Sequence, residues 1–490
     1  MTTMGYSERW KLWRSGSSHL HLARMARLLV ALALGLSVGC LSSRHQVDVE
    51  PALDVSEVWL HQSGEAPRVD RWWSSYGSDA LDRLVDGALA QNLSLTAALL
   101  RVEQSEASVR QQRAGLFPTL DVEVGVNRSR QFVPGPVGAF EQTFFTTSFT
   151  AGYELDVWGR VRSGIAASRA DQAALRMDAE SVAMTLAANV TEAWLDLQFH
   201  RARQALVESQ MQTVQTYLEL ILVRMSVGQA TALEAFQQQQ QLHALQSQLP
   251  MIQTSQQIAS HRLAALLGVT PSALAAPPVE SLPAALPLPD AGVPADLLQL
   301  RPDVRAAQAR AEAADWRVVT AICDRLPSFR LSAGLNMQAT SLLNLFDGIF
   351  WRLAASAAAP LIDGGRRRAA LERARLVREE ALLSWGQTLL TAVVEVEDAL
   401  AQQQGQLAYL ERLRVEHNNA LATLSAARDQ YLNGVADYLR VLTAISTLQQ
   451  IELAQLQAHR ALLSQQVTLF RALGGDWMSE IGLSDRGEEQ

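Results

Sequence analysis

The most reactive side chains in this 490-residue chain are two cysteines, and their surroundings differ. Cys40 follows a basic N-terminal stretch and an apolar run from Leu28 to Val38. A basic stretch, a short apolar stretch and small residues before a cleavage point are typical of a secretory signal. Cys323 lies in an apolar helical pattern without a neighbouring base, which favours a buried structural thiol over a reactive one.

The apolar run ends in Leu36-Ser37-Val38-Gly39-Cys40, a pattern that resembles a bacterial lipobox, in which the cysteine is lipidated. Ser37 departs from the branched aliphatic residue usual at its place, and an ordinary signal peptide with an incidental Cys40 is the alternative. A run of eleven residues is too short to cross a bilayer, which takes about 20. We therefore expect a lipoprotein signal over residues 1–39, lipidation of Cys40, and a lipid-anchored segment over residues 40–71.

Motifs of catalysis and metal binding are missing from the sequence. It has no P-loop, no H-E-x-x-H, no G-x-S-x-G and no Cys/His metal spacing, and its nine histidines and ten methionines are scattered. A net charge of −8 without a basic stripe argues against nucleic-acid binding. We expect no enzyme activity, no cofactor and no metal.

The elements that must position any functional residue come from a unit that occurs twice. Asn92–Ala98 aligns with Arg301–Ala307 at an offset of 209, and Leu267–Gly268 aligns with Leu473–Gly474 at an offset of 206. The second offset holds over more than 100 residues, which indicates a duplicated domain rather than a solenoid. The expected divisions are a first repeat over 72–268, a proline-rich linker over 269–295, a second repeat over 296–475, and a tail over 476–490.

Each repeat has the pattern of a helix, two strands and two long helices. Alternating apolar and polar residues predict strands over about 119–131, 143–157, 328–339 and 349–361. Apolar spacings of three and four predict helices over about 160–227, 229–267, 365–433 and 435–473. Pro250 should kink the second of these helices, and the linker, with seven of the 16 prolines, should be extended.

The four predicted strands are suited to a membrane barrel with a polar inner face. A half-buried sheet in a soluble protein alternates in the same way, but the secretion signal favours the barrel. Four strands cannot close a barrel, because the smallest common barrels have about eight strands and lipid does not tolerate open edges. We therefore expect the barrel to be shared between chains of an oligomer.

Several segments occur in a characteristic order within this duplicated framework: Trp72-Trp73 with Leu81, Leu84 and Ala88; Tyr153–Arg160; Leu300–Val304; and Pro360–Arg366. Together they resemble the outer-membrane factor family of TolC-like exit ducts, and most closely its lipoprotein branch of NodT or OprM type. The resemblance implies a mainly α fold with membrane β. It implies a homotrimer whose 12-stranded β-barrel, with four strands from each chain, lies in the Gram-negative outer membrane and continues as a long periplasmic α-helical barrel.

The same resemblance implies a passive duct that exports small molecules, such as drugs or other toxic compounds. Its partners would be a periplasmic adaptor, an inner-membrane pump of the resistance-nodulation-division type, and outer-membrane lipid. A type I protein-secretion duct shares the fold and is one alternative. A structural coiled-coil lipoprotein of the envelope is another, although it would not explain the four alternating strands.

Two glycine-containing turns join the long predicted helices. The turns are Val227-Gly228-Gln229 and Asn433-Gly434-Val435, and glycine permits the left-handed conformation that an antiparallel helical turn requires. The resemblance places both turns at the periplasmic tip that contacts the adaptor. Glycines that only cap the helices are the alternative.

Family members often carry acidic residues just beyond these turns, where they ring the closed aperture. Glu234 holds this position in the first repeat, whereas Arg440 and Thr443 replace the usual acids in the second and Asp437 is the nearest acid. We take these four as gate candidates. An ion pair between Glu234 and Arg440 would hold the tip closed, and solvated charges on a helix face are the alternative.

Two polar runs have no assigned partner. The run Arg366-Arg367-Arg368 opens a helix against its dipole, so phospholipid head groups, acids of a neighbouring chain or a solvated face could accommodate it. The run Gln237–Gln241 has the pattern of a polar helix face on the wet, tunnel side.

Overall fold

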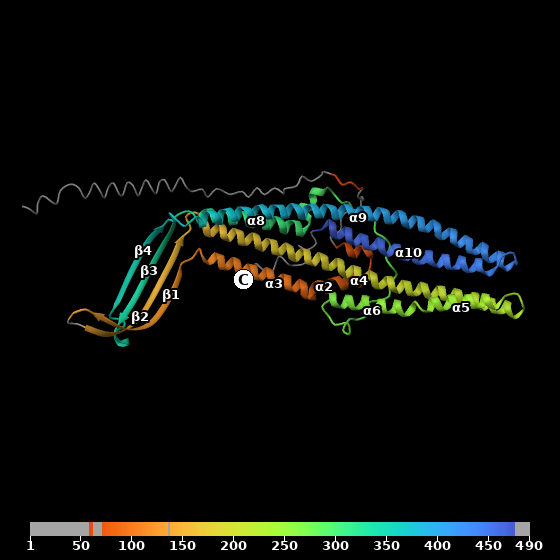
Figure 1. Ribbon diagram of the computed structural model, residues 1–490, viewed down its shortest axis with the longest axis horizontal. Coiled ribbons are helices and arrows are strands. Elements are labelled where there is room, and N and C mark those ends of the chain that lie inside the picture. Colours follow the sequence, from red (N-terminus) through yellow and green to blue (C-terminus); the bar gives the residue numbers. More distant parts are fainter. Residues whose placement is uncertain (1–57, 62–70, 136–137, 476–490) are drawn as a thin grey trace, which may run out of the picture. The chain divides into compact units, whose positions relative to one another are not determined.

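The computed structural model describes residues 58–61, 71–135 and 138–475 (Figure 1). The predicted signal over 1–39, the lipidation candidate Cys40 and the tail over 476–490 lie outside these residues. The chain divides into two compact units. The sheet unit comprises residues 111–166 and 315–375, and the helical unit comprises the remaining described residues.

The sheet unit contains one antiparallel sheet in the order β1-β2-β3-β4 (Figure 1). Its register places Val122 opposite Phe149, Phe149 opposite Leu335, and Leu335 opposite Trp351. Because side chains alternate between faces, these four apolar residues, one from each strand, share one face of the sheet. The strands are β1 (Thr119–Val133), β2 (Gly138–Leu155), β3 (Ser328–Ala339) and β4 (Ile349–Ala358).

Two strand limits differ from the sequence prediction by more than two residues. Strand β2 begins at Gly138 rather than near residue 143, because its first residues pair with the end of β1 as far as Val133. Strand β4 ends at Ala358 rather than near residue 361. Pro360 follows, and proline has no N–H group to extend the ladder.

Two very long helices follow the strands of the two repeats. Helix α4 (Arg160–Ser226) and helix α9 (Arg366–Leu432) each contain 67 residues. At about 1.5 Å per residue, each is roughly 100 Å long. No helix in the described ranges has both the length and the apolar character needed to cross a membrane. The other elements are η1 (Trp72–Tyr76), α2 (Asp79–Gln91), α3 (Leu93–Ala114), α5 (Ala232–Gln246), α6 (Leu249–Leu266), η2 (Pro294–Asp296), α7 (Leu297–Leu300), α8 (Pro302–Cys323), η3 (Leu342–Asn344) and α10 (Tyr438–Leu473).

The arm that follows the first turn was predicted as one helix with a kink at Pro250, and the structure interrupts the helix just before that residue. The structure has two helices, α5 and α6, which are separated at Ser247 and Gln248. Pro250 lies in the first turn of α6, where its missing N–H group would have no helical partner in any case. The corresponding arm of the second repeat, α10, is continuous.

The core of the helical unit forms around tryptophans of the first repeat. Trp73 and Trp194 are fully buried and share a hydrophobic cluster with Leu81 and Leu263. Trp72 stacks on Phe470 of α10 with ring centroids 5.3 Å apart. The adjacent tryptophans of the sequence therefore tie η1 to the C-terminal helix.

The proline-rich linker contacts the helical unit as an irregular segment without a helix before η2. The amide of Leu286 donates to Gln466 Oε1 at 3.1 Å, and Gln466 Nε2 donates back to the Leu286 carbonyl at 2.6 Å. Arg201 of α4 donates to the carbonyls of Pro277 and Pro278 at 3.0 and 2.7 Å. Because prolines cannot donate backbone hydrogen bonds, these side chains supply the links that hold the linker.

Candidate functional site at the two helical turns

The two turns predicted from glycine adopt the same backbone conformation in both repeats. Gly228 and Gly434 are left-handed, with φ of 74° and 71°. The amide of Gln229 donates to the Arg224 carbonyl at 2.8 Å, and the amide of Val435 donates to the Gln430 carbonyl at 2.9 Å. This is a Schellman motif, which ends a helix and reverses the chain.

The turn residues lie at the surface of the helical unit. Val227 and Val435 are 65% and 77% exposed, and Gly228, Gln229, Asn433 and Gly434 are also exposed. Each turn therefore presents one apolar side chain to solvent beside polar neighbours.

Immediately behind the turns, one aromatic residue joins the two helical hairpins. Tyr431 of α9 donates its phenol hydrogen to Glu234 Oε2 of α5 at 3.1 Å. The Arg224 guanidinium of α4 lies over the same ring, 4.6 Å from its centroid. The Tyr438 ring of α10 meets it edge-on at 5.3 Å. We call Arg224, Glu234, Gln238, Tyr431 and Tyr438 the tip cluster.

A buried glutamine extends the tip cluster inward. Tyr438 donates to Gln238 Oε1 at 2.5 Å, and Gln238 Nε2 donates to the Val214 carbonyl at 2.8 Å. Gln238 is fully buried, although the sequence predicted a wet glutamine face; its neighbours Gln239 and Gln240 are exposed. A buried amide is stable here because both its donor and its acceptor groups are satisfied.

Both phenols of the tip cluster are held as neutral donors. Burial raises the pKa of Tyr431, and the Glu234 carboxylate raises it further. Burial likewise raises the pKa of Tyr438. Each phenol therefore keeps the proton that it donates throughout the physiological pH range.

The four gate candidates fall in two places. Glu234 belongs to the tip cluster, whereas Asp437, Arg440 and Thr443 line a cavity of about 470 Å³ between α9 and α10. The expected ion pair between Glu234 and Arg440 is absent from the described part of the chain. The reason is that Glu234 is directed to Tyr431, while Arg440 is exposed beside the cavity.

Sequence reasoning missed the other members of the tip cluster. A signal was present, because two of the seven tyrosines lie three residues before and four residues after Gly434. Those spacings place both rings on the first helical turn at either side of the reversal.

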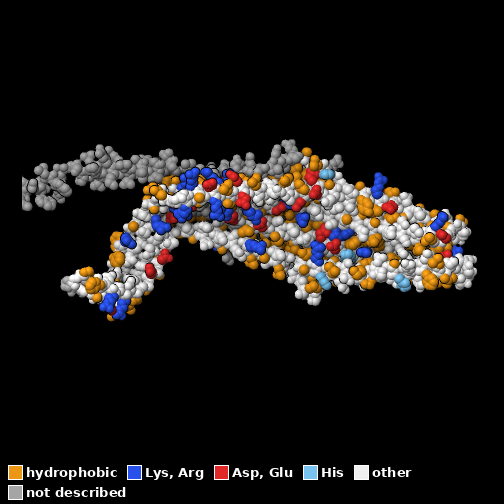
Figure 2. All heavy atoms as spheres, in the orientation of Figure 1, with side chains coloured by type: hydrophobic (Ala, Val, Ile, Leu, Met, Phe, Trp, Pro, Cys, Tyr) orange, Lys and Arg blue, Asp and Glu red, His pale blue; other side chains and the backbone are white. Residues whose placement is uncertain are grey.

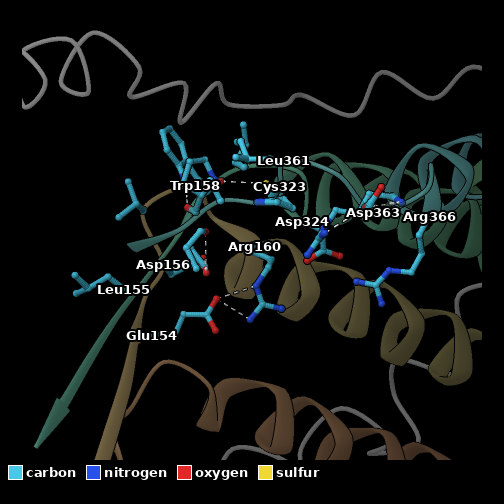
Figure 3. Close-up of a pocket in the computed structure, with 18 of the residues that line it drawn as sticks. Glu154, Leu155, Asp156, Trp158, Arg160, Cys323, Asp324, Leu361, Asp363 and Arg366 are labelled. Carbon is cyan, nitrogen blue, oxygen red and sulfur yellow. Dashed lines mark hydrogen bonds and ion pairs between the residues drawn. The ribbon is translucent and has the colours of Figure 1, made fainter. Parts of the chain in front are cut away.

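A second cavity, of about 780 Å³, lies in the sheet unit where strands give way to helices (Figure 3). Its carboxylates begin the long helices. Asp156 accepts the amides of Val161 and Arg162 at 2.9 and 3.0 Å, and Asp363 accepts the amides of Gly365 and Arg367 at 3.1 and 3.2 Å. Both acids therefore cap helix N-termini, which favour negative charge.

Three more polar side chains of this cavity, those of Glu154, Trp158 and Arg160, also have partners (Figure 3). Arg160 donates to Glu154 at 3.0 Å, and Trp158 Nε1 donates to the Pro327 carbonyl at 2.6 Å. Cys323 is buried, as predicted, and its thiol donates to the Trp158 carbonyl at 3.2 Å. Burial raises the pKa of the Cys323 thiol, which makes it a poor nucleophile.

The arginine run at the start of α9 has one carboxylate partner among the residues that the structure describes. Arg367 donates to Asp363 at 3.2 Å, whereas Arg366 and Arg368 are exposed. Within residues 58–61, 71–135 and 138–475, no three His, Cys, Asp or Glu side chains are grouped to hold a metal ion.

Comparisons with known proteins agree with this architecture. The family model for outer membrane efflux protein matches residues 84–269 and 293–475. The pyoverdine export outer membrane protein OpmQ of Pseudomonas putida is 30% identical over 84% of this chain and 89% of its own length. The outer membrane protein OprJ of Pseudomonas aeruginosa is 31% identical over 91% of this chain and 95% of its own length.

A solved structure extends the likeness to the fold. The outer membrane protein VceC of Vibrio cholerae superposes with a TM-score of 0.76 at 26% identity, covering 84% of this chain and 99% of its own. The fold is accordingly TolC-like, and the family and its relatives are channel proteins. The chain belongs to the outer membrane efflux protein family and is an outer-membrane channel component of an efflux system.

Proposed function

We propose that three copies of the chain close one barrel of twelve strands, four from each chain. The observation that carries this proposal is the sheet itself. It has one largely apolar face across all four strands, and among the residues that the structure describes its edge strands β1 and β4 each pair on one side only. An open edge is not tolerated in lipid, and pairing β4 of one copy with β1 of the next removes both edges.

The trimer is a passive exit duct with no catalytic activity. The long helices α4 and α9 continue from the barrel into the periplasm, and Cys40 carries a lipid that anchors the chain in the outer membrane. A periplasmic adaptor and an inner-membrane pump of the resistance-nodulation-division type deliver the cargo and supply the energy. Relatives named for pyoverdine export, toluene efflux and antibiotic efflux support small molecules as the cargo class.

The tip cluster is the closed gate of this duct, and the exposed turns are its contact with the adaptor. The hydrogen bond from Tyr431 to Glu234 supports this assignment, because it ties one hairpin to the other next to both turns. The remaining gate candidates, Asp437, Arg440 and Thr443, line the cavity between α9 and α10.

Ion conductance in planar bilayers tests the proposal. The purified full chain should migrate as a heat-sensitive trimer and should conduct ions. A structural coiled-coil lipoprotein would do neither. Deletion of the gene should raise susceptibility across a panel of small toxic compounds, whereas loss of a secreted protein without any change in susceptibility would identify a type I secretion duct. The Cys40→Ala variant separates lipid anchoring from conduction.

A further inference from the structure

The apolar face of the sheet ends in basic residues on strand β1. Leu120, Val122, Val124 and Val126 share this face and are 61–75% exposed. Beyond Val126, every second residue of β1 continues the same face, and these residues are Arg128, Arg130 and the exposed Phe132. Figure 2 shows basic side chains gathered at the end of the sheet that bears the β1–β2 connection.

The neighbouring strand contributes one acid to this outward-facing group. Arg130 lies opposite Glu141 in the register, and Arg128 forms an ion pair with Glu141 at 2.7 Å. The two side chains of that pair are 73% and 50% exposed, so the pair is weak. Arg130 forms no ion pair with any residue that the structure describes, which leaves the group with a net positive charge.

The height of these arginines on the barrel follows from the length of the apolar band. From Leu120 to Val126 the strand rises by about 20 Å. An outward-facing arginine is costly at the middle of a bilayer and inexpensive at its interface. Arg128 and Arg130 therefore lie where lipid phosphates lie, and the guanidinium fork forms paired hydrogen bonds with phosphate oxygens.

The connections between the strands and the helices indicate which membrane leaflet the two arginines face. The helices α3, α4, α8 and α9 all join the strands at one end, and the β1–β2 connection lies at the other. With the helices in the periplasm, the arginine end faces the outer leaflet. This step rests on the orientation in the proposed function.

We propose that Arg128 and Arg130 bind the phosphate groups of the anionic glycolipid that forms the outer leaflet of the outer membrane. Phe132 lies beyond the arginines on the same face, in the headgroup region. This lipid site is separate from the conduction path, because the polar residues of the same strands occupy the opposite face of the sheet.

Binding of lipid A to the purified full-length trimer tests the site, with the dephosphorylated lipid and inorganic phosphate as further probes. The double variant R128Q/R130Q should bind phosphorylated lipid A at least roughly tenfold more weakly. E141Q removes the opposing acid and should strengthen binding. R352Q is the matched control, because Arg352 is an exposed arginine on the polar face of the same sheet. The R352Q variant should bind lipid A with the affinity of the wild type.

Equal affinity for dephosphorylated lipid A, or equal losses in R352Q and the double variant, would overturn the lipid site. Full competition by inorganic phosphate at millimolar concentration would also overturn it, since it would indicate a simple ion site. If the double variant does not assemble, E141Q still tests the site: stronger lipid A binding supports the site, and unchanged or weaker binding contradicts it. Conductance is measured in parallel: a conducting trimer without lipid A binding refutes this site alone, whereas a protein that conducts neither as wild type nor as the Tyr431→Phe variant refutes the proposed duct.

Discussion

Tyr431 donates a hydrogen bond to Glu234 over 3.1 Å and thereby joins helices α9 and α5, which belong to different repeats. The ring of Tyr431 has separate roles, because it also contacts the Arg224 guanidinium and the Tyr438 ring. The phenol oxygen can therefore be removed while the packing of the ring is kept.

The Tyr431→Phe substitution should weaken the closed tip. We expect the conductance of the trimer in planar bilayers to rise at least roughly twofold, and the free energy of unfolding to fall by about 1 kcal/mol, the usual worth of one hydrogen bond. Tyr409→Phe is the control, because Tyr409 lies on the same helix and is half exposed. Identical conductance of the two variants would show that the Tyr431 phenol does not hold the gate.

Periodicity made much of the fold predictable. The alternation of apolar and polar residues determines the face that each strand residue occupies. A shift of one residue would have placed Val122 and the apolar residues two positions apart from it on the polar face. The duplication was visible because both repeats need glycine at the same reversals. The family itself could be named from short segments such as Tyr153–Arg160, whose Asp156 begins α4.

Contacts between elements could not be predicted in the same way. Glu234 and Tyr431 are 197 residues apart, and no spacing rule connects them. The sequence suggested Arg440 as the partner of Glu234 because both charges follow a turn, but side-chain direction on two different helices decides such pairs. Pro250 pointed to an irregularity near the boundary of α5 and α6 but not to a full interruption, since proline marks the start of a helix as readily as a kink.

Two glycines at equivalent places in the repeats should be intolerant of any side chain. A Cβ on Gly268 would lie 2.7 Å from the Gln91 carbonyl oxygen, and a Cβ on Gly474 would lie 2.7 Å from that of Leu300. Both glycines also have positive φ, at 72° and 75°. We expect Gly268→Ala and Gly474→Ala each to lower the free energy of unfolding by about 2–4 kcal/mol, from backbone strain and overpacking together.

Gly405 provides the matched control for these glycines. It lies inside α9, and nothing would approach a Cβ within 4 Å. Gly405→Ala should raise the free energy of unfolding by about 0.5–1 kcal/mol, because alanine loses less backbone entropy in a helix. Urea denaturation followed by circular dichroism measures all three variants, and a destabilised Gly405→Ala would contradict the argument.

Asn92 and Arg301 occupy equivalent positions but should differ in their contribution to stability. Asn92 Nδ2 donates to the Leu266 carbonyl at 2.8 Å, and Arg301 Nη1 donates to the corresponding Ala472 carbonyl at 3.0 Å. Arg301 is 5% exposed and also binds two carboxylates, those of Asp303 and Glu395. Its loss therefore leaves two acids without their cation.

Arg301→Met should lower the free energy of unfolding by about 2–4 kcal/mol, because it breaks a largely buried charge network. Asn92→Ala should cost about 1–2 kcal/mol, the worth of the hydrogen bonds of a helix cap. Arg412→Met, at an exposed position of α9, should change little. Equal losses in the Arg301 and Asn92 variants would show that the carboxylates do not depend on Arg301.

His459 should make the helical unit less stable in acid. Burial lowers the pKa of His459, and its hydrogen bond with the backbone of Pro283 opposes this only in part. In the unfolded chain the imidazole titrates near its ordinary value of about 6.5. As pH falls through that value, the unfolded chain binds a proton that the folded chain does not yet bind, so the free energy of unfolding falls.

His459→Gln should therefore lose less stability between pH 7 and pH 5 than the wild type, as measured by urea midpoints at each pH. His261→Gln, at an exposed position of α6, should follow the wild-type profile. A His459→Gln profile parallel to the wild type would mean that this imidazole does not contribute to acid sensitivity.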